Sequence, residues 1–343
     1  MKIRNIVLTS AAALFCTASI SATTASHTWV SGSGSDSNTC TFASPCLTFA
    51  GALAKTTAGG LITAKDAGDF GPVTITQSVT IDGANLGSIT FTSGSGITIS
   101  AAANVVLQNL TINGLGVAFY GISAAGGGIV TVDNCRIMNI KAIGVYFAGT
   151  GNLTIEDSRI ESFSGSNVTG IYIDSNAAEN VVVRNTVIDA SPFSADSWGF
   201  YVYSGTGPVQ ASLQDVTILG AGAEAVYTET GTTQITGSVL TQSWTGVYAN
   251  GSTISVASSL ITANTTGVCS FAGSKIRLDN NDIYDNTTAI GNCGGIVKTS
   301  TTNKTSGTIA IPAADISESV TFYLRKFIAE RERSVQIHSS TQL

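Results

Sequence analysis

The chain has 343 residues, among them 37 glycines and only 5 prolines, and charged residues make up 11% of it. Globular chains usually carry roughly 25% charged residues, so this composition argues against helical bundles, which are rich in Glu, Lys and Arg. With 16 basic and 22 acidic residues the net charge is −6, which argues against nucleic acid as a partner.

The first segment predicts export. Residues 1–22 combine Lys2 and Arg4 with an apolar stretch over 6–20, which is the pattern of a secretory signal peptide. We therefore expect a mature protein that is secreted, periplasmic or attached to the cell surface. No later segment offers about 20 uninterrupted apolar residues, so no membrane span is expected.

Cysteines are the next feature along the chain. Once Cys16 is removed with the signal segment, five of the six cysteines remain in a compartment that permits disulfides. Cys40 and Cys46 enclose a turn that contains proline and are the expected bridge. Cys269 with Cys293 is a second candidate pair, although their positions in the repeat described below differ by two residues.

Residues 23–60 are expected to form a disulfide turn followed by a capping helix. The segment Thr48–Thr57 (TFAGALAKTT) has helix-compatible spacing and could lie across the first turn of the fold. Such a cap would protect an open strand edge from association with other chains.

Residues 61–310 carry an internal repeat, which is the strongest signal in the sequence. One apolar column, with spacings of 21 to 30 residues, consists of Ile112, Ile137, Ile160, Ile188, Ile218, Leu240, Ile261 and Ile283. Positions seven and five residues before each anchor are almost wholly apolar, and the residues between them are mostly polar. This alternation predicts strands with their apolar side inward.

A second column marks a tight corner in every repeat. It lies three residues before each anchor and reads Asn109, Asn134, Asp157, Asn185, Asp215, Gly237, Ser258 and Asn280. These residue types tolerate the left-handed backbone region or cap a turn with their own side chains. Another strand follows each anchor, so the sequence predicts a parallel β-helix.

The tail, residues 311–343, has a different pattern. From Asp315 onward, Ile316, Val320, Leu324 and Phe327 recur at helical spacing. We expect an amphipathic helix that covers the last turn.

The chain resembles the pectin-lyase-like superfamily of right-handed parallel β-helix proteins. The resemblance spans about 29–308 and is most specific over 46–83, where CLTFAGALAKTTAGG leads into LITAKDAGDFGPVTITQSVTIDG. It implies the right hand of the coil, in agreement with the rule for parallel crossovers. The tail after Ala313 does not fit the usual ending.

Members of this superfamily include polysaccharide lyases and glycoside hydrolases. The Asn-Thr-Asp motif, the Asp pair, the His in a Gly-rich strand and the Arg-Ile-Lys motif of polygalacturonase-like members are missing here. Both histidines, His27 and His338, lie outside the predicted coil, and no CxxC motif is present, so a metal site built on these ligands is not expected. The sequence leaves enzymatic activity open and leans against it.

Acidic residues provide one candidate site. Asp133 and Glu156 share an outward column on adjacent turns, Arg184 follows in that column, and Arg159 lies around the corner. Two carboxylates about 4.8 Å apart could share Ca²⁺, with Arg159 as the base of a lyase. A ladder of surface ion pairs, in which Glu156 pairs with Arg184, is the favoured explanation of the column. Asp279, Asp282 and Asp285 form a weaker calcium candidate, or merely corner residues.

Aromatic residues provide the other candidate site. Two residues after the start of each second strand stand Tyr146, Tyr172, Tyr201, Tyr227 and Tyr248. Alternation places all five outward, so five turns would display flat rings on which sugars stack. A ladder that only stabilises the sheet is the competing interpretation.

These patterns lead to three hypotheses. The first is an exported, monomeric scaffold without cofactor that binds a glycan or a cell-surface component through the tyrosines. The second is a calcium-dependent lyase, or a glycosidase, that acts on acidic glycan. The third is a structural or adhesive rod.

Overall fold

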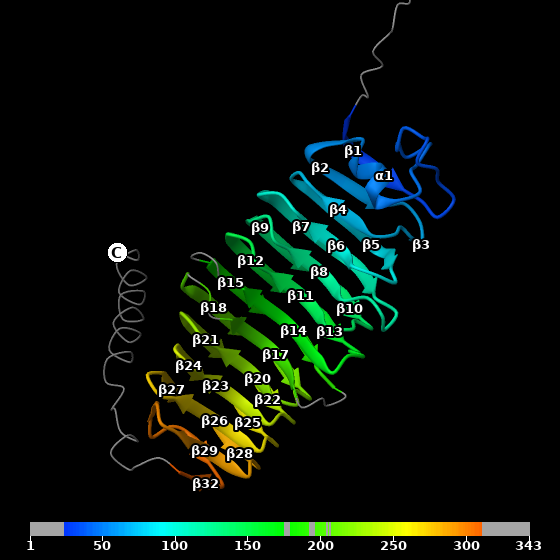
Figure 1. Cartoon of the computed structure of the whole chain (residues 1–343). Helices are drawn as coiled ribbons and strands as arrows, with labels where there is room; N and C mark the ends of the chain where they lie inside the picture. Colours follow the sequence, from blue (N-terminus) through cyan, green and yellow to red (C-terminus); the bar gives the residue numbers. More distant parts are fainter. Residues whose placement is uncertain (1–23, 175–178, 192–195, 204, 206, 311–343) are drawn as a thin grey trace, which may run out of the picture.

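The chain winds into an elongated coil whose turns stack on one another (Figure 1). The structure is a computed structural model and describes residues 24–174, 179–191, 196–203, 205 and 207–310. The strands of successive turns pair in parallel and form one sheet of 21 strands and one of 11 strands. A parallel β-solenoid of this kind confirms the predicted fold class.

Each turn contributes a strand before the corner, a strand after it, and a strand on the opposite side of the coil. The strands that precede the corner or run through it are β1 (Ala25–Val30), β2 (Thr56–Ala64), β5 (Val79–Thr90), β7 (Ala103–Asn113), β9 (Gly128–Asp133), β12 (Gly151–Glu156), β15 (Glu179–Arg184), β18 (Val209–Gln214), β21 (Thr232–Thr236), β24 (Thr253–Ala257), β27 (Lys275–Asp279) and β30 (Ile296–Thr299). The strands after the corner are β3 (Gly68–Asp69), β10 (Arg136–Met138), β13 (Arg159–Glu161), β16 (Val187–Asp189), β19 (Thr217–Leu219), β22 (Val239–Thr241), β25 (Leu260–Thr262), β28 (Asp282–Tyr284) and β31 (Lys304–Thr305). The eleven-stranded sheet consists of β4 (Val73–Ile75), β6 (Ser95–Ile99), β8 (Tyr120–Ala124), β11 (Ile143–Phe147), β14 (Asn167–Asp174), β17 (Asp196–Tyr203), β20 (Glu224–Thr228), β23 (Thr245–Ala249), β26 (Thr266–Phe271), β29 (Thr288–Cys293) and β32 (Thr308–Ile309).

Equivalent apolar residues lie directly over one another inside the coil. Val130 pairs with Leu153, and Leu153 pairs with Val181 on the next turn. The whole anchor column from Ile112 to Ile283 is in register and fully buried. The predicted period therefore gives the correct register of the core.

The corner column has the left-handed backbone that its residue types predict. All eight corner residues have φ between 44° and 62°. Their side chains also bond along the coil, because Asn134 Nδ2 donates to Asn109 Oδ1 at 2.7 Å and Asn109 Nδ2 donates to Asp82 Oδ1 at 2.8 Å. The corner thus combines an unusual backbone with a side-chain ladder.

A buried polar ladder runs beside the apolar core, and the sequence did not predict it. The backbone N–H of Ser238 donates to Ser259 Oγ at 3.1 Å, and that of Ser259 donates to Asn281 Oδ1 at 3.0 Å. All three side chains are buried. They satisfy backbone donors at the corner, where the strand ladder is interrupted.

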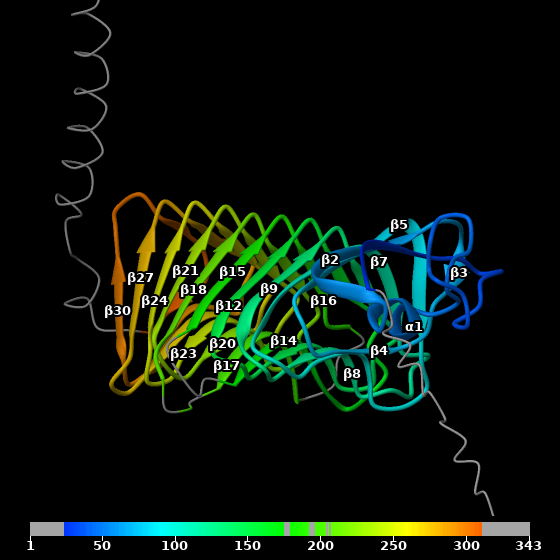
Figure 2. The same cartoon turned by 90° about the horizontal axis from the view of Figure 1, so that it is seen from above.

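The N-terminal end is covered in a different way from the prediction. Within residues 24–60, which the structure describes, only Phe49–Leu53 (α1) is helical, and the chain enters β2 at Thr56. The structure does not support a helix over 48–57, because Gly51 and the β-branched Thr56 and Thr57 weaken it. Figure 2 shows α1 at the end of the coil opposite to β30.

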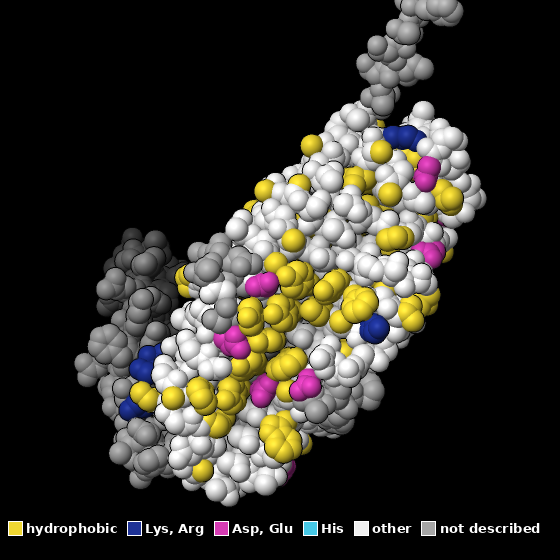
Figure 3. All heavy atoms as spheres, in the orientation of Figure 1, with side chains coloured by type: hydrophobic (Ala, Val, Ile, Leu, Met, Phe, Trp, Pro, Cys, Tyr) yellow, Lys and Arg dark blue, Asp and Glu magenta, His cyan; other side chains and the backbone are white. Residues whose placement is uncertain are grey.

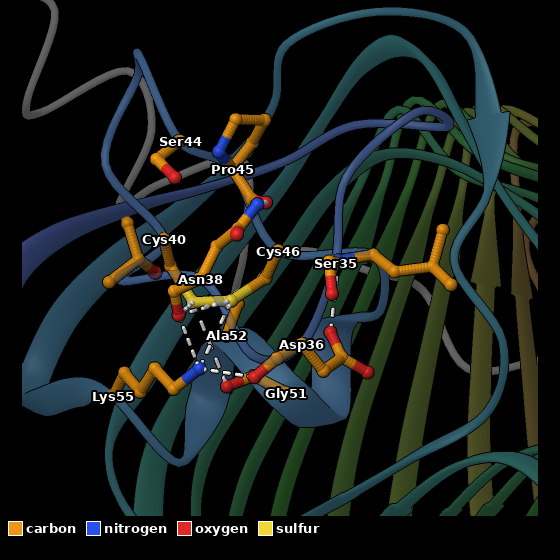
Figure 4. Close-up of a disulfide and its surroundings, with 12 residues drawn as sticks. Ser35, Asp36, Asn38, Cys40, Ser44, Pro45, Cys46, Gly51, Ala52 and Lys55 are labelled. Carbon is orange, nitrogen blue, oxygen red and sulfur yellow. Dashed lines mark hydrogen bonds between the residues drawn. A yellow bond between two sulfur atoms is a disulfide. The ribbon is translucent and has the colours of Figure 1, made fainter.

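The loop that contains the Cys40–Cys46 disulfide bonds to the edge of β1. Trp29 N donates to Cys40 O at 2.7 Å, and Cys46 N donates to Trp29 O at 2.9 Å. Figure 4 shows Lys55 donating to the carbonyl oxygens of Asp36 and Asn38 beside this disulfide. Backbone pairing with this loop therefore occupies the β1 edge.

Both predicted disulfides form. The Cα atoms are 4.6 Å apart in Cys40–Cys46 and 5.8 Å apart in Cys269–Cys293, which is within the usual range for a disulfide despite the two-residue offset of the second pair. Cys135 is free and buried, and burial raises the pKa of its thiol to about 12. It is therefore an unreactive core residue.

The ends of the coil also bear on three other predictions. β1 pairs with β2, so the coil begins before residue 61 and includes His27. The signal segment 1–22 and the C-terminal helix of 311–343 lie outside the described residues. Among the described residues there is no helix of the length and apolarity that a membrane crossing requires.

Substitution of Asn134 separates the contributions that the left-handed backbone and the side-chain ladder of the corner make to stability. Asn134→Ala loses the ladder bond and also places a residue with a Cβ, but no compensating polar group, at φ 47°. Asn134→Gly loses the bond but accepts the backbone. We expect Asn134→Ala to lower the free energy of unfolding by about 2 kcal/mol, and Asn134→Gly by about 1 kcal/mol less than that. Urea unfolding followed by circular dichroism measures both, and equal losses would contradict the backbone contribution.

Candidate functional site

The five predicted tyrosines form one column on the outside of the eleven-stranded sheet. Tyr146, Tyr172, Tyr201, Tyr227 and Tyr248 pair in register on successive turns, and we call them the tyrosine stripe. Their strand neighbours point inward and are buried, as Val145 and Phe147 show for Tyr146. Alternation along each strand therefore places these phenols on the outer surface, where they are half-buried.

The rings lean on one another instead of lying flat. Successive ring centroids are 5.7, 5.1, 4.8 and 5.3 Å apart, with interplanar angles of 25°, 78°, 39° and 52°. Rings that lay side by side in one plane could not approach this closely. The stripe therefore presents ring edges and partial faces, and the flat platform expected from the sequence is wrong.

Further aromatic side chains extend the stripe. Tyr120 lies 5.6 Å from Tyr146, and Trp198 lies 5.3 Å from Tyr201, between ring centroids. Phe119 continues the run at 6.4 Å from Tyr120. The sequence pattern did not identify these three residues, because they stand outside the column of equivalent positions.

Carboxylates hold the phenolic hydroxyl groups. Tyr146 donates to Asp174 Oδ2 at 3.0 Å, while Tyr201 and Tyr227 both donate to Glu229 Oε1, at 3.0 and 2.8 Å. Burial, together with the bond to Asp174, raises the pKa of Tyr146 to about 12. Burial and Glu229 act in the same direction on the pKa of Tyr201. The phenols are therefore neutral hydrogen-bond donors.

Glu224 is a carboxyl group in an unusual environment. It begins β20, and its Oε2 accepts a hydrogen bond of 2.7 Å from the indole N–H of Trp198. Burial raises the pKa of Glu224, and the bond from Trp198 only partly opposes this effect. Its charge and that of Glu229 both raise the pKa of Tyr227, so these two carboxyl groups act on the same phenol.

The charge on this sheet is one-sided. Within the described residues, its eleven strands contain Asp174, Asp196 and Glu224 but no lysine or arginine, and Glu229 follows β20 directly. Figure 3 shows acidic side chains along both sides of the band of yellow side chains that crosses this face. The sheet therefore presents an aromatic band between acidic borders.

The predicted acidic column is on the other sheet and contains one ion pair. Asp133, Glu156 and Arg184 are in register as expected, and Arg184 NH1 lies 3.8 Å from Glu156 Oε2. A cation bound by Glu156 would therefore compete with Arg184. The interpretation as a ladder of ion pairs agrees with this geometry, and a catalytic role for Asp133 and Glu156 stays a prediction.

Arg159 belongs to a different cluster. It pairs with Glu161 on its own strand, and Glu161 also binds Arg136 NH2 at 2.6 Å. Burial alone would raise the pKa of Glu161. The hydrogen bonds from Arg159 and Arg136 outweigh this effect and lower the pKa. A shallow cavity of about 220 Å³ beside the two arginines is lined by corner side chains such as Asn134. No repeat position predicts Glu161, because it stands one residue after the anchor Ile160.

The weaker calcium candidates are spread over separate interactions. Asp279 accepts a hydrogen bond from Thr302 at 2.9 Å, and Asp282 lies 3.2 Å from Lys304 Nζ. Asp285 occupies a second left-handed corner, at φ 59°. Across the part of the chain that the structure describes, no three Asp, Glu, His or Cys side chains are placed to share a metal ion.

Comparisons with known proteins agree with this architecture. The model of the right handed beta helix region matches residues 73–211 and 198–322. No curated protein sequence matches significantly. Among solved structures, the A-module of mannuronan C-5 epimerase AlgE4 from Azotobacter vinelandii superposes with a TM-score of 0.58 and 17% identity, over 73% of this chain and 80% of that one. The pectate lyase Pel9A gives a TM-score of 0.51 and 12% identity, over 87% of this chain and 80% of that one.

Glu224 is expected to make stability depend on pH. Because its pKa is raised on folding, the folded state holds a proton that the unfolded state releases above about pH 4.5, so stability falls as the pH rises through that window. Glu224→Gln keeps an acceptor for Trp198 and cannot ionise. We expect a flatter profile of melting temperature against pH and a higher melting temperature at neutral pH. Identical profiles for the variant and the original protein would contradict the burial of this carboxyl group.

Proposed function

Since the chain belongs to the right-handed beta helix family, we propose that it is an exported protein that binds a glycan along its tyrosine stripe. The observation that carries this proposal is the run of five tyrosines in register, with phenols bonded to Asp174 and Glu229. The stripe follows the long axis of the coil, so the expected ligand is an extended chain.

The chemistry of the stripe suits a sugar. Aromatic carbon atoms pack against the C–H faces of sugar rings, while carboxylate and phenol oxygens accept hydrogen bonds from sugar hydroxyl groups. Polar groups that are already oriented lose little entropy when a ligand binds. Glu229 is held in this way by Tyr201 and Tyr227.

Two further observations support the proposal. The mannuronan epimerase and the pectate lyase that share the fold are named for polysaccharides. The two disulfides suit an oxidising compartment, so we infer a location in the periplasm, at the cell surface or in the medium. Catalysis is not part of this proposal, because Glu156 and Arg159 both lie in ion pairs.

The alternative role of the stripe is purely structural, and substitution distinguishes the two roles. One variant changes Tyr172, Tyr201 and Tyr227 together to Ala and loses both the rings and the hydroxyl groups. A second variant changes the same three residues to Phe and keeps the rings. We expect the Ala variant to lose glycan affinity by at least about tenfold, since each aromatic contact contributes roughly 0.5–1.5 kcal/mol. We expect the Phe variant to lose less. Retention on a glycan array and calorimetric titration measure the effect.

Tyr284→Ala is the matched control, because Tyr284 is a half-buried tyrosine on the other sheet. It should leave glycan binding intact. If the Ala variant of the stripe keeps its fold and retains glycans as well as the original protein does, the stripe has only a structural role.

A further inference from the structure

We propose that the glycan bound by the stripe is a polymer of amino sugars, whose protonated amines pair with the carboxylates that border the tyrosines. This inference rests on the proposed glycan-binding function and names its ligand class. It is argued from the charge of the sheet and from the positions of the acceptor groups.

The charge of the sheet opposes the binding of a polyuronate, which is the alternative ligand class. Asp174, Asp196, Glu224 and Glu229 border the band, and the strands of the sheet carry no lysine or arginine within the described residues. A polyuronate would bring further carboxylates against these groups, and like charges brought together on desolvation oppose binding. A polycation is attracted by the same surface.

Lys141 precedes β11, on the side of the sheet where Asp196 and Glu224 begin β17 and β20. Its Nζ lies 4.8 Å from the ring centroid of Phe119, which is next to Tyr120. The carboxylates follow from β14 onward. The carboxylates therefore flank the stripe from the turn of Tyr172 to the turn of Tyr227.

The acceptors are distributed along the axis as a polymer requires. Asp174 on β14 is bonded to Tyr146 on β11. Glu229 is bonded to tyrosines of two successive turns. Turns are about 4.8 Å apart, so the two carboxylates address different positions along an extended ligand.

An ammonium group matches these acceptors. It offers three donors and no acceptor, and both carboxylate and phenol oxygens accept from it. Exposed aromatic faces add cation–π attraction; the ring of Tyr203, which is 43% exposed, lies 6.2 Å from that of Tyr172. Pairing with an ammonium would also offset the burial that raises the pKa of Glu224.

Calorimetric titration with two oligosaccharides of equal length tests this inference. One is a fully deacetylated β-1,4-glucosamine oligomer, and the other is its N-acetylated counterpart, which has the same backbone without the charge. The pH is chosen so that both the amines and the carboxylates are charged. We expect the deacetylated oligomer to bind at least about tenfold more tightly, and added salt to weaken it selectively.

Charge variants locate the effect. Asp174→Asn with Glu229→Gln keeps acceptors for the phenols but removes two charges, and it should abolish the preference for the deacetylated oligomer. Asp215→Asn removes an exposed acidic charge at a corner of the other sheet. It should leave the preference for the deacetylated oligomer unchanged. The comparison of the two ligands on the original protein does not depend on the folding of any variant.

The remaining outcomes separate this inference from the proposed function. Equal or tighter binding of the acetylated oligomer, or binding of polygalacturonate, would overturn the amino-sugar inference and leave glycan binding in place. A preference that survives in the double variant would overturn the role of the carboxylates. Failure to bind any of these chains and any glycan on an array would overturn the proposed function, and the inference with it.

Discussion

The strands of one turn find most of their backbone partners only in the turns above and below, and this constraint governs the rest of the structure. Residues at equivalent positions must lie over one another, so each position becomes a column that extends through the coil. An apolar column such as Val130, Leu153 and Val181 becomes core. A column of Asn and Asp becomes a continuous corner, because these residues accept φ near 50° and bond to their neighbours.

Columns also explain how much the sequence could predict. The inward positions, the corner and the tyrosine stripe all repeat, so spacing alone located them correctly. Trp198, Tyr120 and Glu161 belong to single turns, and no period identifies a residue that occurs once. Ring tilt could not be predicted either, because it depends on how neighbouring phenols and Glu229 pack together. The N-terminal end differs from prediction for a related reason: it lies where the repeat stops, and backbone bonds from the disulfide loop to Trp29 form there.

Stability and recognition draw on the same side chains in the proposed site. Contacts between rings hold the phenols in place, and the phenols in turn donate hydrogen bonds to the carboxylates of Asp174 and Glu229. A ligand would therefore meet acceptors that are already fixed by the fold. On the opposite sheet Glu156 lies 3.8 Å from Arg184, whereas the strands of the tyrosine-bearing sheet contain no lysine or arginine within the described residues. The tyrosine stripe and the acidic column therefore differ more in how their carboxylates are partnered than in how many charged residues they contain.

The tyrosine column has fixed ends. Ser123 occupies its position on the turn before Tyr146, and the disulfide-bonded Cys269 occupies it on the turn after Tyr248. Five positions about 4.8 Å apart span roughly 19 Å, so the length of ligand that can contact the column is fixed. A ligand longer than this column gains no additional contacts with the five equivalent tyrosines, but it can bind them in several overlapping positions and slide between these positions. Chain length would then influence residence time and avidity through the number of such positions, while the footprint on the protein stays constant.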